Sequence, residues 1–272
     1  MRTVASSAYV RDGARESREI KNSIERVWVV EMIRLGVGGA LGKMGSRILS
    51  LAAQDKDFKI VLALERLTHP QIGERIGGVE LVSRLDAIKE TDGLIDFSLP
   101  EATLEHLSCA VKFKKPLVIG TTGFSEEQKK EILAMSKKIP IVFSPNMSIG
   151  VNLLFSLVQQ AASQLPPEYK VTMSEAHHIH KKDAPSGTAK GLADIVRKER
   201  GEVDININSI REGEIIGDHE VVFDSSWDTI KLSHSAKTRD IFAKGALEAM
   251  KFVVGKKPGL YNMQDVLKES AR

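Results

Sequence analysis

From Met32 onward, short apolar runs alternate with segments whose apolar residues recur at helical spacing. The apolar runs span five ranges: 32–38, 58–64, 93–97, 116–120 and 140–143. Helical patterns lie between them over 44–54, from Pro100, and from Ser125, where Ser-Glu-Glu-Gln has the form of a capping box. Short buried strands that alternate with helices are typical of a parallel sheet covered on both faces, so a Rossmann-like α/β domain is predicted.

The pattern changes after about residue 148. A helical segment at 150–163, a strand at 169–176 and a helix at 187–199 come first. Three strand-like runs and a long helix follow, at 204–211, 215–224, 228–235 and 238–253. This order predicts a smaller α+β domain with a mixed or antiparallel sheet. We therefore expect one domain at 32–147, completed by residues 238–272, and a second domain at 148–237.

Residues 1–31 stand apart from both predicted domains. They carry six basic and five acidic residues and lack a continuous apolar centre. A secretory signal needs such a centre, and a transit peptide is poor in acidic residues, so neither is indicated. We expect a disordered N-terminal extension without a catalytic role.

The composition excludes several classes of protein. Lys and Arg number 39 against 36 Asp and Glu, and the net charge of +3 over 272 residues is too small to indicate a nucleic-acid or membrane partner. Hydrophobic residues make up 42% of the chain and charged residues 28%, as in ordinary globular proteins. The single cysteine, Cys109, excludes an intrachain disulfide and fits the reducing cytoplasm.

A glycine-rich turn lies between the first predicted strand and the first predicted helix. Gly39, Gly42 and Gly45 have the spacing G-x-x-G-x-x-G, whereas the commoner G-x-G-x-x-G pattern would place a glycine at Leu41. Such a turn brings backbone N–H groups to a pyrophosphate at a helix N-terminus, although glycine runs also occur in ordinary loops. The candidate cofactor-binding residues are Gly39, Ala40, Leu41, Gly42, Lys43, Met44 and Gly45.

An acidic-basic pair supports the dinucleotide interpretation. Glu65 and Arg66 follow the second strand, and Glu65 lies twenty residues beyond Gly45. Dinucleotide-binding folds place there the carboxylate that accepts hydrogen bonds from the ribose hydroxyls. Arg66 could stack on the adenine or pair with a 2′-phosphate, so the pair suggests use of both NADH and NADPH. The alternative is an exposed charged pair in a loop.

The richest chemistry lies in residues 175–188, which read E-A-H-H-I-H-K-K-D-A-P-S-G-T. The segment joins the end of a strand to the start of a helix that Ser186 can cap, and Gly187 and Thr188 offer free backbone N–H groups there. Histidines and lysines beside a helix N-terminus favour a pocket for carboxylates or phosphate, with groups that can transfer a proton near neutral pH.

Zinc is a competing interpretation of the three histidines. The spacing of His177, His178 and His180 does not readily bring three nitrogens to one tetrahedral centre, and no nearby cysteine completes a ligand set. No metal site is therefore predicted.

Together these motifs resemble the 4-hydroxy-tetrahydrodipicolinate reductase (dihydrodipicolinate reductase) family from Met32 to Leu267. The glycine turn, the Glu65-Arg66 pair and the whole of 175–188 match its pattern. Three further segments match: 95–103 (I-D-F-S-L-P-E-A-T), 120–124 (G-T-T-G-F) and 144–148 (S-P-N-M-S). Of all these matches, the motif at 175–188 is the most specific to the family.

The resemblance implies reduction of a small cyclic dicarboxylate by NADH or NADPH in a homotetramer. It implies that His177 and Lys181 are catalytic and that His178, Gly187 and Thr188 bind substrate. It also implies that further residues contact the cofactor, namely Gly120, Thr121, Thr122, Ser144, Pro145, Asn146 and Met147. Residues 32–147 would then bind the dinucleotide, and residues 148–237 would bind substrate and form the oligomer.

The chain differs from the family pattern at two places, and two alternative functions remain open. The stretch before Asp218 is shorter than in the longest family members, which affects the expected tetramer interface, and Leu99 stands where some relatives have an arginine near the cofactor.

Another amino-acid-pathway dehydrogenase would share the first half but lack the histidine-lysine run. A non-catalytic dinucleotide sensor would not need His177 and Lys181.

Overall fold

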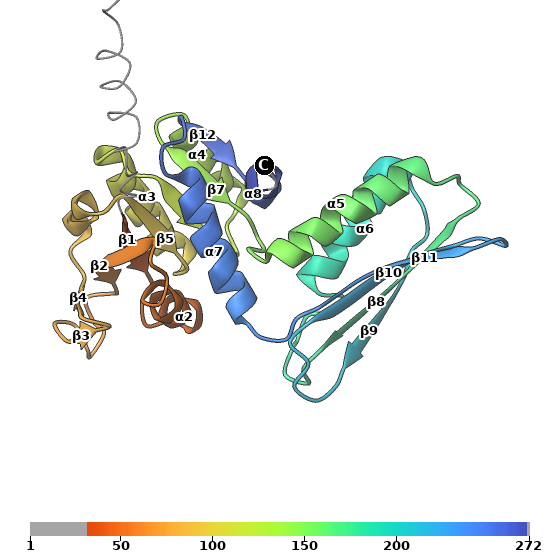
Figure 1. Ribbon diagram of the computed structural model, residues 1–272, viewed down its shortest axis with the longest axis horizontal. Helices are drawn as coiled ribbons and strands as arrows, with labels where there is room; N and C mark the ends of the chain where they lie inside the picture. Colours follow the sequence, from red (N-terminus) through yellow and green to blue (C-terminus); the bar gives the residue numbers. More distant parts are fainter. Residues whose placement is uncertain (1–31, 271–272) are drawn as a thin grey trace, which may run out of the picture. The chain divides into compact units, whose positions relative to one another are not determined.

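The computed structural model of the chain describes residues 32–270, so the extension predicted for residues 1–31 lies outside the described residues. Within residues 32–270, no helix combines the length and apolarity needed to cross a membrane. Two sheets, each with its own helices, make up the fold (Figure 1).

The first sheet has the strand order β12-β7-β6-β5-β1-β2-β4-β3. All its neighbouring strands are parallel except β3 and β4, which are antiparallel. The bounds are β1 Ile33–Gly38, β2 Phe58–Leu64, β3 Arg75–Ile76, β4 Val79–Val82, β5 Gly93–Asp96, β6 Leu117–Ile119, β7 Pro140–Phe143 and β12 Gly259–Tyr261. Since β1 lies between β2 and β5, the strand order reverses there, and ligands of open α/β sheets bind at such a point.

Helices cover both faces of this sheet because its strands are apolar on both sides. In β6, Val118 packs into a core with α2 (Lys43–Ala52) and α7 (Asp240–Val253). Its neighbours Leu117 and Ile119 pack on the opposite face with α3 (Pro100–Lys112) and α4 (Glu126–Ser136). The doubly covered parallel sheet predicted from the sequence is therefore confirmed.

The second sheet is smaller and mixed, with the order β11-β10-β8-β9. Strands β8 (Lys170–His177) and β9 (Asn206–Arg211) are parallel, while β10 (Asp218–Asp224) is antiparallel to β8 and to β11 (Thr229–Ser235). Helices α5 (Ile149–Gln164) and α6 (Gly187–Arg200) pack on one face (Figure 1). Alternate residues of β8 and β10 point to these helices, among them Met173 and Phe223. This agrees with the predicted α+β unit.

Several short elements lack a strong sequence pattern. The 3₁₀ helix η1 (Leu85–Glu90), strands β3, β4 and β12, and helix α8 (Met263–Ser270) have no counterpart in the sequence prediction. Strands of two to four residues are too short to show a period of two. Strand β12 pairs with β7 and so extends the first sheet from the C-terminal segment. The domain limits drawn from the sequence stay predictions.

Candidate active site

The glycine turn joins β1 to α2 in a conformation that depends on its glycines. Gly39 has a φ of +68°, which is strained for other residues. A Cβ atom on Gly45 would lie 2.0 Å from the carbonyl oxygen of Gly39, so only glycine lets the helix approach the turn this closely. Gly42 is the N-cap of α2, and no side chain caps the helix there, which leaves its N-terminus open to a phosphate.

A cleft of about 680 Å³ lies beside this turn at the carboxyl ends of β1, β2 and β5. Glu65 lines it, and its Oε2 accepts a hydrogen bond from the N–H of Leu41 at 3.3 Å. The structure thus brings together the turn and the carboxylate that were predicted to share one site. The lining also includes Gly39, Leu41, Gly42, Arg66, Ser98, Leu99 and His106. Glycines, a helix N-terminus and a carboxylate around one cleft fit a dinucleotide.

Two further predicted cofactor segments follow β6 and β7. The buried Thr121 hydroxyl accepts a hydrogen bond from the N–H of Ser98 at 3.0 Å, and Phe97 fills the space beside Gly120. Thr122 is exposed next to them. These three predicted residues do not line the cleft beside the glycine turn.

The predicted cofactor residues 144–147, which follow β7, differ in burial and in their contacts. Met147 is 2% exposed and belongs to the core, so its side chain is not available to a cofactor. The hydroxyl of Ser144 donates to the backbone carbonyl of Asn146, which holds the loop in shape. Pro145 is exposed. The side-chain amide of Asn146 reaches Thr188 at the start of α6.

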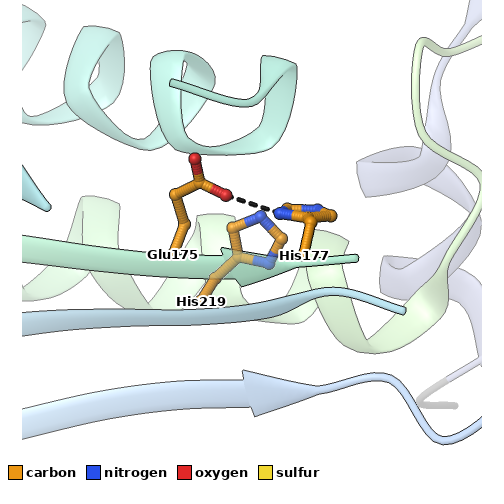
Figure 2. Close-up of side chains that lie close together, drawn as sticks. All are labelled: Glu175, His177 and His219. Atoms are coloured by element: carbon orange, nitrogen blue, oxygen red, sulfur yellow. Dashed lines mark hydrogen bonds and ion pairs between the residues drawn. The ribbon is translucent and has the colours of Figure 1, made fainter. Parts of the chain in front are cut away.

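Three buried side chains meet between β8 and β10. Glu175 and His177 lie two residues apart on one face of β8, and Oε2 of Glu175 lies 2.5 Å from Nδ1 of His177 (Figure 2). His219 on β10 pairs directly with Glu175 in the strand register. Its ring packs edge-on against that of His177, with 5.1 Å between the ring centres.

The second carboxylate oxygen of Glu175 is held from two other elements. It accepts hydrogen bonds from the N–H of Ser186 at 3.2 Å and from Nη2 of Arg211 at 2.7 Å. Burial on its own would raise the pKa of Glu175. The hydrogen bonds from Arg211 and His177 outweigh burial and lower that pKa to about 2, so the carboxylate is ionised.

Both histidines are neutral at pH 7. Burial lowers the pKa of His177, against the hydrogen bond to Glu175, which raises it. Burial, and next to it repulsion from His177 when that ring is protonated, lower the pKa of His219 to about 4. Nε2 of His219 lies 3.1 Å from the hydroxyl of Ser186, which also accepts a hydrogen bond from the N–H of Ala189 and so caps α6 as predicted.

Lys181 and the N-terminus of α6 are the remaining parts of the candidate site. Nζ of Lys181 lies 2.8 Å from a carboxylate oxygen of Asp183, and this hydrogen bond lowers the pKa of Asp183. Gly187 and Thr188 form the first turn of α6, and within residues 32–270 no atom beyond the adjoining residues and helix backbone lies within 4 Å of the position that a Cβ of Gly187 would take. A carboxylate could therefore approach this helix N-terminus.

The histidine cluster read from the sequence divides in two. His177 joins Glu175 and His219, whereas His178 and His180 lie near each other with 6.1 Å between ring centres. Ligand atoms of Glu175, His177 and His219 lie within 4.8 Å of one another. The two oxygens of Glu175 accept hydrogen bonds, one from His177 and the other from the guanidinium of Arg211.

Glu175, Arg211 and His219 are functional residues that were not predicted from the sequence. Glu175 could have been found, because residues i and i+2 of a strand share a face and His177 was already a candidate. Arg211 and His219 lie on other strands, and only the strand pairing brings them to Glu175.

The Rossmann-like sheet, its glycine-lined cleft and the buried acid-base network define a dinucleotide-dependent oxidoreductase. Two family models cover nearly all of the described residues: "Dihydrodipicolinate reductase, N-terminus" at 33–147 and "Dihydrodipicolinate reductase, C-terminus" at 150–267. The chain therefore belongs to the dihydrodipicolinate reductase family, and its cofactor is a nicotinamide dinucleotide.

Individual relatives agree with this assignment. A protein named 4-hydroxy-tetrahydrodipicolinate reductase from Pelagibacter ubique is 42% identical to this chain, over 88% of this chain and 99% of that protein. The protein of the same name from Aquifex aeolicus is also 42% identical, over 86% of this chain and 98% of its own length. A dipicolinate-bound dihydrodipicolinate reductase from a Paenisporosarcina species superposes with a TM-score of 0.74 at 25% identity, over 85% of this chain and 97% of that one. An amine dehydrogenase from Mycobacterium smegmatis shares the fold alone, with a TM-score of 0.61 at 12% identity.

Proposed function

We propose that the protein reduces 4-hydroxy-tetrahydrodipicolinate to tetrahydrodipicolinate in lysine and diaminopimelate biosynthesis. In the balanced reaction the substrate gains a hydride and a proton and loses water. The observation that carries the proposal is the position of His177, which is held by Glu175 and lies in the segment that leads to the open N-terminus of α6. An acid-base group and a carboxylate-binding helix end are the two features that reduction of a cyclic dicarboxylate needs.

The catalytic groups are His177 and Lys181. The proton of the reaction comes from the ammonium group of Lys181, or from Nε2 of His177 once that nitrogen has taken up a proton. Lys181 pairs with Asp183, whose carboxylate keeps the ammonium group close to the end of β8. The ammonium group of Lys181 also stabilises the negative charge that develops on the substrate, and such electrostatic stabilisation is commonly the largest contribution to catalysis.

The substrate carboxylates bind through the backbone and a neighbouring histidine. The N–H groups of Gly187 and Thr188 at the start of α6 hold one carboxylate, and the helix dipole adds to this attraction. His178 contacts the same ligand. Its Nδ1 is buried and has no hydrogen-bond partner among residues 32–270, which leaves it free for a substrate oxygen.

The dinucleotide binds in the cleft beside the glycine turn, and its reduced nicotinamide supplies the hydride. Glu65 accepts hydrogen bonds from the ribose hydroxyls, and Arg66 meets the adenine or a 2′-phosphate, so both NADH and NADPH serve. The residues that hold the pyrophosphate are those of the turn, 39–45. The segments 120–122 and 144–147 complete the cofactor site, with Met147 contributing through its backbone.

The enzyme works in the cytoplasm as a homotetramer. Residues 32–147, with the C-terminal segment 238–272, bind the dinucleotide. Residues 148–237 bind the substrate and make the subunit contacts. The loop at 144–148 acts as a hinge between them, and closure about it excludes water before transfer.

A coupled assay tests this function. The purified protein is mixed with NADH or NADPH and with the freshly formed condensation product of pyruvate and aspartate semialdehyde, and absorbance at 340 nm is followed. We expect absorbance to fall with either cofactor, and pyridine-2,6-dicarboxylate, a stable planar mimic of the substrate, to inhibit competitively. Titration with both cofactors gives their relative affinities.

Two other outcomes would overturn the proposal. Binding of NADH without any loss of absorbance at saturating substrate would leave a non-catalytic dinucleotide sensor. Turnover of aspartate or another amino acid, with none of the dicarboxylate, would indicate a different amino-acid-pathway dehydrogenase.

A further inference from the structure

The buried carboxylate of Glu175 is connected to three elements of the second sheet and its helices. Oε2 faces Nδ1 of His177 at 2.5 Å, within the same strand β8. Oε1 accepts from the N–H of Ser186 at the start of α6 and from the guanidinium of Arg211 at the end of β9. The side chain has no solvent-exposed surface. A buried carboxylate is costly unless it is paired and hydrogen-bonded, so these contacts satisfy Glu175 fully.

The ionised carboxylate determines which nitrogen of His177 carries the proton. A carboxylate is only an acceptor, so the close contact requires a hydrogen on Nδ1. In the neutral ring Nε2 is then the unprotonated nitrogen, and any second proton must bind there. Among the described residues Nε2 has no hydrogen-bond partner. It faces Gly217, where a Cβ atom would lie 3.1 Å away, so the missing side chain leaves room at the reactive nitrogen.

Arg211 extends the same arrangement to Lys181. Its Nη2 donates both to Glu175 and to the backbone carbonyl of Asp183. Asp183 in turn pairs with Nζ of Lys181. One guanidinium therefore fixes the carboxylate behind His177 and the loop that places the ammonium group of Lys181.

We propose that Glu175 is a positioning residue that fixes His177 in the Nδ1-protonated tautomer, and that Arg211 is a second positioning residue that holds Glu175 and the Lys181 loop in place. This inference rests on the proposed function, in which His177 transfers a proton through Nε2. During that transfer the proton moves between Nε2 and the substrate, while the Nδ1 proton and the negative charge of Glu175 stay in place.

The key variant is Glu175→Gln, which keeps the shape of the side chain but removes its charge. A glutamine can donate to Nδ1 as well as accept from it, so His177 can take the wrong tautomer. We expect kcat to fall about 10²- to 10⁴-fold, as when the acid behind a catalytic histidine is made neutral. We expect KM and the Kd for NADH to change less than threefold. Glu168→Gln removes the same charge from an exposed position before β8 and is the matched control.

The pH profile separates positioning from a merely structural role. The carboxylate of Glu175 raises the pKa of His177, while burial and the charges of Lys181 and Arg211 lower it. His219 is the other titratable group that packs on this ring. Without the carboxylate, the His177 limb of the kcat profile shifts to lower pH, whereas Glu168→Gln leaves the profile unchanged. An unchanged profile for Glu175→Gln would contradict the proposal.

Nitrogen NMR of protein labelled with ¹⁵N-histidine reports the tautomer without any turnover. The His177 signals are assigned by their loss in His177→Gln. We expect Nδ1–H in the wild type and a mixture or Nε2–H in Glu175→Gln. Nε2–H in the wild type would overturn the inference even if the enzyme is active. The expected tautomer in a protein that does not turn over the dicarboxylate would leave the inference intact and reject the proposed function.

Arg211→Lys provides a second variant if Glu175→Gln does not fold. It keeps the positive charge but replaces the planar guanidinium, whose Nη2 bonds Glu175 and Asp183 while Nη1 bonds the carbonyl of Ile210, by a single ammonium group. We expect a smaller loss of kcat, about 10-fold or more, with a partly changed tautomer signal. Wild-type kcat and a wild-type spectrum in Arg211→Lys would remove Arg211 from the proposal.

Discussion

The side-chain amide of Asn146 donates a hydrogen bond to the hydroxyl of Thr188 at 3.3 Å, although 42 positions separate them in the chain. Asn146 is fixed in its loop, because its side-chain oxygen accepts from the N–H of Ser148 and its carbonyl accepts from the amide of Asn152. Thr188 lies in the first turn of α6. The loop that follows β7 is therefore tied to the helix start that we propose as the carboxylate site.

This bond predicts coupling between Asn146→Ala and Thr188→Val. Each variant loses one partner of a neutral hydrogen bond worth about 0.5–1.5 kcal/mol, so kcat/KM should fall about 2- to 10-fold. The double variant should lose less than the product of the two single losses, since the bond can be removed only once. The measurement is kcat/KM together with the Kd for pyridine-2,6-dicarboxylate. Strictly multiplicative losses would show that the two residues act independently.

Replacement of the catalytic groups should affect turnover and not cofactor affinity. In His177→Gln or Lys181→Ala, we expect kcat to fall about 10²- to 10⁴-fold, the usual contribution of a general acid or base. The Kd for NADH, measured by nicotinamide fluorescence, should stay within threefold of the wild type. His180→Gln is the matched control, because His180 is an exposed histidine of the same segment. An equal loss of NADH affinity would place His177 and Lys181 in the cofactor site instead.

The glycine turn allows the same change, glycine to alanine, to be tested at two positions where the added Cβ atom would be crowded to different degrees. A Cβ on Gly45 would lie 2.0 Å from the carbonyl oxygen of Gly39, whereas a Cβ on Gly42 would lie 3.1 Å from the same atom. Gly45→Ala must displace the turn, so it should cost about 1–3 kcal/mol of stability and weaken NADH binding. Gly42→Ala should cost less on both counts. Urea unfolding and NADH titration measure the two effects, and equal losses in both variants would contradict the close packing of α2 against the turn.

Local signals in the sequence account for much of the fold. Strands β2 and β7 have the limits that their apolar runs predict, because a buried parallel strand is apolar along most of its length. The capping box at Ser125 and Gln128 is present with both of its hydrogen bonds, since it depends on residues only three positions apart. Features set by neighbouring residues are therefore readable without the structure.

The candidate site was only partly predictable, because residues far apart in the sequence assemble it. Adjacent histidines in the sequence suggested one cluster, but the strand sends His177 to the helix-covered face and the chain turns away after it. Arg211 and His219 reach Glu175 through the pairing of β8 with β9 and β10. Their partners depend on strand register across more than 30 residues, which no local pattern specifies.

The buried imidazole of His219 should make the stability of the protein depend on pH. Its pKa is about 4 in the folded chain, because burial and the nearby His177 disfavour the charged form, and near 6.5 when unfolded. The unfolded chain therefore binds a proton more readily between these values. The stability from a neutral His219 is complete above about pH 6.5 and is lost as the pH falls toward 4.

His219→Gln should therefore reduce the loss of stability between pH 7 and pH 5 by about 2 kcal/mol. Urea unfolding at the two pH values measures it. Glu175 does not interfere, because its pKa of about 2 confines its own effect to pH below about 4.5. The buried His177 and the partly buried His234, whose pKa values are also lowered by burial, remain in the variant and account for the residual slope. His180→Gln removes an exposed histidine and should leave the slope unchanged. A wild-type slope in His219→Gln would mean that this imidazole reaches water in the folded protein.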